Sequence, residues 1–241
     1  MDLSDDDRAT LFRAGSDALR FNAPLGDDRA RALVDELGRR GVRSVVDLGC
    51  GRGGLARLVT VRLDGVSVTG VDADANAVTA ARTSAAEAGL GDRVRFEVGD
   101  AATWCEPVDA AIAVGVSHAF GGPAAQFARL ANLAASGIAL VGDGVWETEP
   151  DAWCLTNLGE QPTSAGGLAA LAEAAGWTVL AADLSTQDEW DAFEGGWVAG
   201  VRSVGSPVAE AFAAERERQY REHYRGVLAF CWLVLTRSPS R

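Results

Sequence analysis

Residues 45–54, VVDLGCGRGG, combine a carboxylate with a run of closely spaced glycines. The apolar residues before Asp47 predict a buried strand, and the apolar periodicity of residues 55–63 predicts a helix. Glycine lets a backbone turn sharply and approach a bound molecule closely. The first turn of a helix also has N–H groups that no helical carbonyl accepts. The stretch therefore predicts a strand, a ligand-binding turn and a helix.

The charge of Asp47 narrows the choice of ligand for this turn. The spacing Gly49-x-Gly51-x-x-Gly54 also fits the dinucleotide-binding pattern, whose ligand carries an anionic pyrophosphate. A carboxylate two residues before the first glycine would repel that pyrophosphate and attract an ammonium or sulfonium group. S-adenosylmethionine carries both cations, so the sequence favours it over NAD. A structural turn with a buried acid is the remaining alternative.

This stretch resembles the first motif of the class I S-adenosylmethionine-dependent methyltransferases, an apolar residue followed by Asp/Glu-x-Gly-x-Gly. The resemblance implies that Asp47 lies near the methionyl end of the cofactor. It also implies that Gly49 and Gly51 lie under the ribose and amino-acid part, with Cys50 between them. The fold that it implies is α/β, a doubly wound, seven-stranded, mostly parallel sheet.

Two further acids stand at the ends of the next predicted strands. Asp72 lies about twenty residues beyond the glycine turn, where nucleotide-binding folds place an acid against ribose hydroxyls, and a carboxylate can accept two such bonds. Ala73 would then lie against the adenine. Capping of the next helix is the alternative role, although Asp74 suits it better. The resemblance places Asp100 at the adenine amino group and the N–H of Ala101 at a ring nitrogen; otherwise Asp100 is a turn aspartate.

The loop after the predicted strand 108–114 holds a candidate base. By the resemblance, Val114 and Gly115 contact the cofactor through their backbone. His118 follows, next to the transferable methyl group. It could take a proton from an O–H, N–H or S–H nucleophile, because histidine changes charge near neutral pH; fixing the loop is its alternative role. The Asn/Asp-Pro-Pro-aromatic motif of DNA amino-methyltransferases is absent here, which argues against base methylation.

Polar and aromatic residues after the predicted strand 138–141 are candidates for substrate binding and catalysis. Asp143 and Glu147 can bind a polar or cationic substrate, or act as bases. Trp146 can form an apolar or cation-stacking wall, and we expect it to bind the substrate together with His118. The segment is similar to a Gly-acid-Gly-aromatic-Trp-Glu-x-x-Pro segment in a group of bacterial class I methyltransferases. A loop held down by the tryptophan is the alternative.

A second aromatic group lies near the end of a charged helix predicted over residues 209–225. His223 and Tyr224 come three and four residues after Tyr220, so Tyr220 shares a helix face with both. If that face lines a substrate cleft, Tyr220 and Tyr224 bind the substrate; otherwise the face packs on the sheet.

The rest of the chain predicts strands that alternate with helices, as in a doubly wound parallel sheet. The expected strands are residues 42–48, 66–71, 94–98, 108–114, 138–141, 177–184 and 227–235. Residues 1–41 predict a helical lead-in. Residues 144–164 and 187–225 interrupt the alternation, and we interpret them as lid or substrate inserts in a single domain of residues 1–241.

Composition narrows the class of function. The chain has 241 residues, a formal net charge of -12 and 48% hydrophobic residues, and it shows no basic stripe of the kind that binds nucleic acid. No apolar run approaches the ~18 residues needed to cross a bilayer, and the acidic start lacks the layout of a signal peptide. The four cysteines are scattered, so disulfides and metal sites are not expected and a reduced cytoplasm is the natural setting.

Together these patterns favour one function and leave two alternatives. The favoured one is a cytoplasmic methyltransferase that moves a methyl group from S-adenosylmethionine to an O, N, S or C atom of a small molecule. It would act as a monomer or homodimer, without metal, nucleic acid or membrane. The first alternative is an S-adenosylmethionine-binding protein without transfer activity, a sensor or a partner subunit. The second is a dehydrogenase, which Asp47 disfavours.

Overall fold

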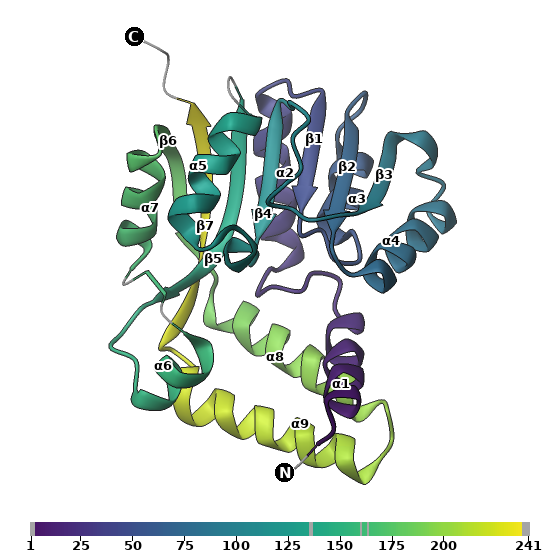
Figure 1. Ribbon diagram of the computed structural model, residues 1–241, viewed down its shortest axis with the longest axis vertical. Coiled ribbons are helices and arrows are strands. Elements are labelled where there is room, and N and C mark those ends of the chain that lie inside the picture. Colours follow the sequence, from purple (N-terminus) through teal and green to yellow (C-terminus); the bar gives the residue numbers. More distant parts are fainter. Residues whose placement is uncertain (1–2, 135–136, 160, 163, 238–241) are drawn as a thin grey trace. The chain divides into compact units, whose positions relative to one another are not determined.

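The computed structural model describes residues 3–134, 137–159, 161–162 and 164–237 (Figure 1). Its strands form a seven-stranded sheet in the order β3-β2-β1-β4-β5-β7-β6. The strands are β1 (Ser44–Leu48), β2 (Ser67–Asp72), β3 (Val94–Val98), β4 (Ala110–Val114), β5 (Ile138–Trp146), β6 (Trp177–Leu184) and β7 (Leu228–Arg237). Neighbours from β3 to β5 pair in parallel, whereas β6 and β7 are antiparallel. The expected fold class is confirmed.

The chain divides into two compact units, each described here by itself. The first, which we call the helical unit, consists of Met1–Leu25, Trp146–Gln161 and Ser185–Ala229. The second, the sheet unit, consists of Gly26–Val145, Pro162–Leu184 and Phe230–Arg241. The segments predicted as inserts contribute most of the helical unit, together with part of the predicted lead-in.

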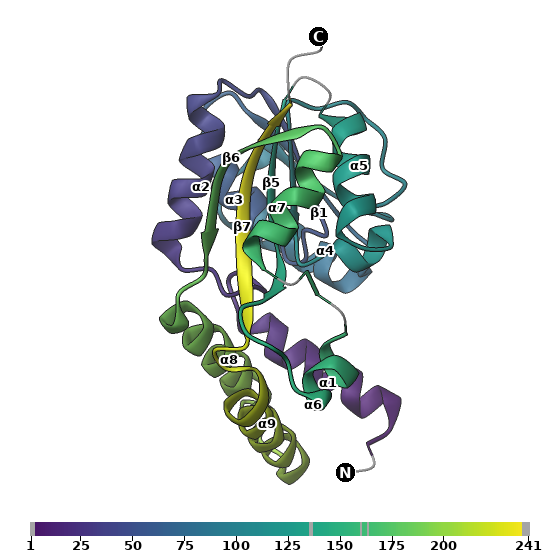
Figure 2. The same ribbon diagram turned by 90° about the vertical axis from the view of Figure 1, so that its left-hand side faces the viewer.

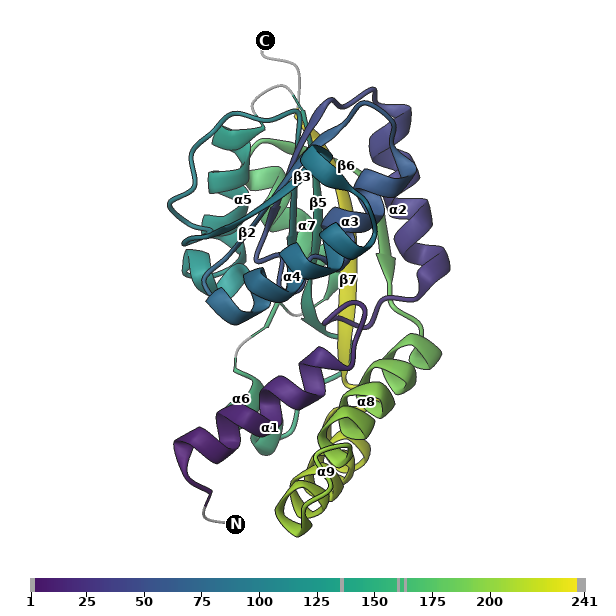
Figure 3. The same cartoon turned by 90° about the vertical axis from the view of Figure 1, so that its right-hand side faces the viewer.

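Helices cover both faces of the sheet, which is why its central strands are almost wholly apolar. Val46, Ile112 and Leu140 in β1, β4 and β5 have no exposed surface. Two helices, α2 (Asp27–Arg39) and α3 (Gly54–Arg62), lie on one face, while α5 (Pro123–Leu133) and α7 (Ala165–Ala174) lie on the other (Figures 2 and 3). The sheet unit also contains α4 (Ala75–Glu87) and the 3-10 turns η1 (Gly91–Arg93) and η2 (Ser117–Phe120). Parallel strands with helical crossovers bring the ends of β1 to β5 to one edge.

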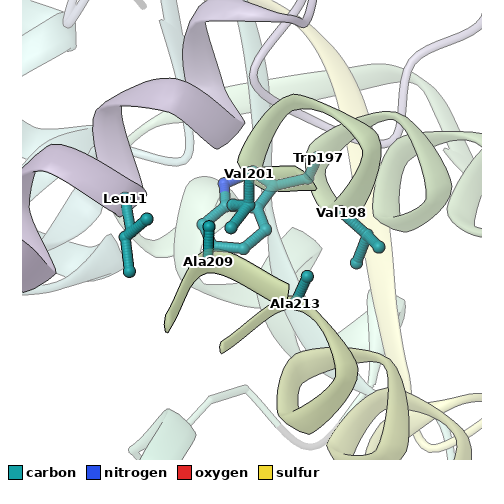
Figure 4. Close-up of a cluster of buried hydrophobic side chains, with 6 residues drawn as sticks. All are labelled: Leu11, Trp197, Val198, Val201, Ala209 and Ala213. Carbon is teal, nitrogen blue, oxygen red and sulfur yellow. The ribbon is translucent and has the colours of Figure 1, made fainter. Parts of the chain in front are cut away.

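The helical unit has a hydrophobic core of its own. It contains α1 (Asp5–Asp17), α6 (Ala152–Leu158), α8 (Gln187–Arg202), α9 (Pro207–Gln219) and the π-helix η3 (Tyr220–Tyr224). Leu11, Trp197, Val201, Ala209 and neighbouring side chains join α1, α8 and α9 (Figure 4). A Cβ on Gly15 would lie 2.3 Å from the Trp197 ring, so only glycine lets α1 approach α8 this closely.

Two sequence predictions need correction. β5 continues to Trp146 instead of ending at Val141, so Asp143 lies inside a strand and not in a loop. The charged helix predicted over 209–225 begins earlier and ends in the π-helix η3. None of the described helices is long and apolar enough to span a membrane.

Candidate cofactor and substrate site

The glycine turn after β1 is fastened to the end of β2. The N–H groups of Gly49 and Cys50 both donate to the Val71 carbonyl, at 2.8 and 3.0 Å. The next N–H, that of Gly51, donates to Asp72 Oδ2 at 2.7 Å. Because these three N–H groups already have protein acceptors, they are not free to cradle a pyrophosphate. The turn therefore lacks a feature that dinucleotide binding would use.

Two glycines at this edge face open space. Gly51 and Gly115 have φ angles of +52° and +64°, in the left-handed region that favours glycine. A Cβ added to either would meet no atom within 4 Å. Gly49 differs, because a Cβ there would lie 2.7 Å from Val116 Cγ2. The ends of β1 and β4 thus touch at Gly49, and both leave exposed backbone that a flat ligand can approach.

Asp47 is a buried acid with few groups around it that stabilise its negative charge. Its Oδ2 accepts one hydrogen bond, from the N–H of Ala56 in α3 at 3.2 Å, and no described residue forms an ion pair with it. Burial, helped by the nearby Asp72 carboxylate, raises the pKa of Asp47 to about 7, although the hydrogen bond from Ala56 lowers it in part. A buried carboxylate at the end of β1 without a basic partner suits a ligand that brings its own positive charge.

Cys50 packs into the protein. A Cβ on Gly70 in β2 would lie 2.9 Å from the Cys50 sulfur, which shows that the thiol faces the strand. Burial raises the pKa of this thiol, so it stays protonated and is no nucleophile. Contact between Cys50 and the cofactor remains a prediction.

The acids after β2 and β3 have defined partners. Asp72 Oδ1 accepts the N–H of Asp74 at 2.9 Å while Oδ2 holds Gly51, and each oxygen keeps a lone pair for a ribose hydroxyl. Asp74 caps α4, as predicted, by accepting the N–H of Asn76. Asp100 Oδ1 accepts the N–H of Ala102 at 2.8 Å, the geometry of a turn aspartate. Its role at the adenine remains a prediction.

Backbone contacts tie the ends of these strands into one edge. The Gly99 N–H donates to the Asp72 carbonyl at 2.9 Å, and the Gly115 N–H donates to the Gly142 carbonyl at 2.8 Å. Ala101 is buried and Ala73 is exposed beside this edge. A Cβ on Gly142 would lie 2.6 Å from the Phe230 ring. The close approach that this glycine permits is therefore made by β7.

Asp143 and His118 are neighbours within the sheet unit. Asp143 is 6% exposed; its Oδ1 accepts the Gly144 N–H at 2.9 Å, and its fully buried Oδ2 has no hydrogen-bond partner among the described residues. Burial raises the pKa of Asp143, and the nearby Ser117 hydroxyl and His118 offset this in part. His118 is exposed in η2. This pair can accept a hydrogen bond from a ligand and take its proton.

The third catalytic candidate belongs to the other unit. Glu147 is exposed, and its N–H donates to the Val227 carbonyl at 2.9 Å. Trp146, just before it, is buried. His118 and Asp143 are therefore neighbours in the sheet unit, whereas Trp146 and Glu147 belong to the helical unit.

The aromatic residues of η3 are linked through Trp153 of α6, whose ring lies parallel to both His223 and Tyr224. Tyr220 and Tyr224 pack with ring centroids 5.1 Å apart, whereas His223 stacks on Trp153 of α6 at 4.4 Å. The His223 Nδ1 also lies 2.8 Å from Asp151 Oδ2. The spacing of a π-helix differs from that of an α-helix, so the predicted common face holds for the two tyrosines and His223 departs from it.

Comparison with known proteins finds similarity to methyltransferases. A family described as a methyltransferase domain matches residues 45–137. The chain is 28% identical over 214 residues to YjhP of Escherichia coli K12, an uncharacterised protein, covering 85% of this chain and 86% of YjhP. It is 35% identical over 93 residues to the trans-aconitate 2-methyltransferase of Rhizobium meliloti, covering 37% of this chain and 34% of that enzyme.

A solved structure has the same fold along almost the whole chain. The S-adenosylmethionine-dependent methyltransferase of Geobacter sulfurreducens, crystallised with S-adenosylhomocysteine, superposes with a TM-score of 0.82 and 24% identity. The match covers 95% of this chain and 98% of that one. At this identity the likeness establishes the fold alone.

Proposed function

We propose that the chain is a class I S-adenosylmethionine-dependent methyltransferase, as the match of residues 45–137 to a methyltransferase-domain family supports, and that it methylates a small molecule of neutral or positive charge. Its methyl donor is S-adenosyl-L-methionine, and the product of that donor is S-adenosyl-L-homocysteine. The glycine turn, the open backbone at Gly51 and Gly115, and the carboxylates of Asp47 and Asp72 suit this cationic donor.

The charge that we propose for the substrate is inferred from one observation at Asp143. The buried Oδ2 of Asp143 has no hydrogen-bond partner among the described residues, and it lies in the same unit as His118. A buried acceptor without a donor costs free energy, and an ammonium, N–H or O–H group of a ligand would recover it. A carboxylate there would be repelled. The net charge of -12 on the chain would also repel an anionic substrate at long range.

The proposed substrate differs in charge from trans-aconitate, after which some of the relatives are named. Trans-aconitate carries several carboxylates, and the matching segment covers only 34% of the Rhizobium enzyme. The shared part therefore supports a common methyl donor, and the substrate is inferred from Asp143.

Each candidate residue has a place in the proposed reaction. The bound donor supplies a methyl group on a sulfonium sulfur, and the substrate nucleophile must lie in line with the bond that breaks. Asp143 accepts a hydrogen bond from an N–H or O–H group of the substrate other than the proton that is lost and so fixes its position, while a ring nitrogen of His118 takes the proton of the nucleophile. We assign Trp146, Tyr220 and Tyr224 to the apolar part of the substrate.

A screen of metabolite fractions tests the proposal. Extracts are divided into cationic, neutral and anionic pools and incubated with the enzyme and methyl-labelled donor. We expect label in the cationic or neutral pool, and at least tenfold less transfer with Asp143→Asn at unchanged S-adenosylhomocysteine affinity. The exposed Asp64→Asn is the matched control. Label in trans-aconitate or the anionic pool alone would contradict the proposal. Donor binding without any label would favour a sensor.

We also propose that the enzyme works in a reducing compartment such as the cytoplasm, as a monomer or homodimer, without nucleic acid or membrane partners. All four cysteines are free, which suits reducing conditions. The acidic composition opposes binding to phosphate backbones. A gel shift at low salt checks the second point, since micromolar binding to DNA or RNA would contradict it.

A further inference from the structure

The sheet unit has a second cavity at the amino ends of its strands. This cavity has a volume of about 400 Å³ and is lined by the ends of α2 and α3 and by the segments that lead into β1 and β2. The glycine turn lies at the opposite, carboxyl end of β1. We call this space the amino-edge cavity. None of the residues that line it belongs to the proposed methyl-transfer site.

Contacts between α2 and α3 form one wall of the amino-edge cavity. Arg62, at the end of α3, binds Asp35 of α2 through two hydrogen bonds of 2.7 and 2.8 Å. A Cβ on Gly38 would lie 2.7 Å from Leu63 Cδ2, so Leu63 packs directly on the backbone of α2. This wall is therefore held in place by the protein itself, without help from a ligand.

The part of the cavity that borders the core is apolar. Val42 and Val66 are 7% and 4% exposed, and Leu63 lines the cavity beside them. Pockets for small molecules combine apolar walls of this kind with a few polar groups that fix the orientation of the ligand. These three side chains suit the hydrocarbon part of a small molecule.

Arg43 supplies a positive charge at the same cavity. A Cβ on Gly65 would lie 3.2 Å from Arg43 Nη1, which places the guanidinium over this glycine. In the described part of the chain, no side chain or carbonyl forms a hydrogen bond or ion pair with that guanidinium. Asp109 interacts with it electrostatically, but the backbone N–H groups of Arg43 and Ser44 already bind this carboxylate. Arg43 can therefore offer two parallel N–H groups to a ligand carboxylate.

The charges around the cavity favour an anion. Arg39 and Arg40 share a single carboxylate, that of Glu36, at 2.8 and 3.3 Å. The fully exposed Asp64 faces Arg93 at 3.8 Å. The last turns of α2 and α3 each contain an arginine, which offsets the partial negative charge of the helix ends. The acids at this edge are thus matched or outnumbered by arginines, although the whole chain has a net charge of -12.

We propose that the amino-edge cavity binds a small organic acid. Its carboxylate pairs with Arg43, and its hydrocarbon part lies against Val42, Leu63 and Val66. The ligand class is a monocarboxylate with a branched or aromatic body, because the cavity offers one unpaired guanidinium beside an apolar wall. This site is separate from the proposed methyl-transfer site, and its occupancy does not depend on methyl transfer.

Nuclear magnetic resonance of the full chain, with labelled leucine and valine methyl groups, tests this inference. The probes are benzoate and benzamide, which have nearly the same shape, and only benzoate is charged. We expect benzoate to shift the methyl resonances of Leu63 and Val66 in a saturable way at millimolar concentrations. Benzamide should bind roughly fivefold more weakly, which is the effect of one partly exposed ion pair. Val141, buried in β5, should keep its resonances unchanged.

Arg43→Gln removes the charge and should weaken benzoate binding roughly fivefold, while benzamide binds as before. Arg95→Gln is the matched control, because Arg95 is exposed, pairs with Glu97 and Glu106, and does not line the cavity; this variant should bind benzoate like the wild type. Equal binding of the two probes, the absence of shifts at Leu63 and Val66, or unchanged benzoate binding by Arg43→Gln would overturn the proposal. If Arg43→Gln fails to fold, the comparison of the two probes on the wild type still decides.

Discussion

The sheet unit and the helical unit differ in whether their buried carboxylates are paired with an arginine. In the sheet unit, Asp47 and Asp143 are buried carboxylates whose pKa values burial raises, and no arginine of the described chain forms an ion pair with either. In the helical unit, Glu194 is equally buried, but Arg216 binds both of its oxygens. The sheet unit therefore leaves negative charge available, whereas the helical unit neutralises its own.

This difference indicates what each unit is suited to bind. An unpaired buried carboxylate lowers the stability of the ligand-free protein, and such a cost is typical of a site that a ligand completes. In the sheet unit we propose that the completing group is a cation, as in S-adenosylmethionine. In the helical unit the buried carboxylate of Glu194 is already neutralised by Arg216, so this carboxylate needs no cation from a ligand.

The largest expected effect concerns His118. If the nucleophile carries a proton, His118→Ala should lower the rate of methyl transfer by roughly 10²–10⁴, because the exposed ring lies near Asp143 and can act as the base. The His118 side chain makes none of the hydrogen bonds that fasten the glycine turn to β2. The rate is measured under single-turnover conditions. His223→Ala is the matched control, since that ring is paired with Asp151; it should change stability more than rate.

Two results would change the role of His118. Loss of S-adenosylhomocysteine binding in His118→Ala would mean that the residue shapes the cofactor site. A normal rate with a protonated nucleophile would move the base to Asp143, Glu147 or Tyr220.

A smaller effect is expected for the acid at the end of β2. Asp72→Ala removes the acceptor for Gly51 and the proposed ribose contacts, and each bond to a charged acceptor contributes about 1.5–3 kcal/mol. Calorimetry should show at least tenfold weaker binding of S-adenosylhomocysteine.

Asp74→Ala is the control for Asp72, because Asp74 caps α4 without touching the glycine turn. Loss of such a cap costs about 1 kcal/mol of stability, so affinity should stay within about twofold. Equal affinity of wild type and a folded Asp72→Ala would refute the ribose assignment.

The pH dependence of stability distinguishes the two kinds of acid. The folded pKa of Asp47, about 7, is above the usual value of about 3.9, so the native state binds more protons and loses stability as pH rises from about 4 to 7. Asp47→Asn, which stays neutral, should raise the free energy of unfolding by roughly 1–4 kcal/mol above pH 7 and by less at pH 5. Urea denaturation of the ligand-free protein measures both values.

Asp109 provides a control of opposite sign. Its carboxylate accepts the N–H groups of Arg43 and Ser44, which lower its pKa. Asp109 therefore stabilises the fold above its unfolded pKa, and that contribution is lost as pH falls through the folded pKa. Asp109→Asn should destabilise the protein at pH 8. A gain for both variants at pH 8 would contradict the pKa assignments.

Local signals in the sequence account for most of the sheet unit. Each expected strand is present, because β-branched apolar runs bounded by glycine and polar residues mark buried strands clearly. The roles of Asp74 as a helix cap and of Gly51 as an open turn residue also follow from neighbours in the sequence. β5 extends further than expected, because Gly142 and Asp143 interrupt its apolar pattern while Phe230 of β7 packs over it.

The helical unit could not be predicted in the same detail. Arg216 and Glu194 pair across 22 positions of the chain. The alternating charges of α9 are typical of a solvent-exposed face, so the sequence does not show that Arg216 neutralises a buried carboxylate. His223 lies in the π-helix and pairs with Asp151, and no periodicity in the sequence predicts a π-helix there. Trp197 joins a different cluster from Trp190, which helical spacing alone does not reveal.

Proton release on cofactor binding tests most directly whether the sheet unit receives a cation. Calorimetry at pH 7 in buffers of different ionisation enthalpy counts the protons exchanged when S-adenosylmethionine binds. Because the pKa of Asp47 is about 7 in the ligand-free protein, a bound cation should ionise it and release roughly half a proton more from wild type than from Asp47→Asn. The variant should also bind more weakly. Equal proton exchange and equal affinity in the two proteins would contradict this account.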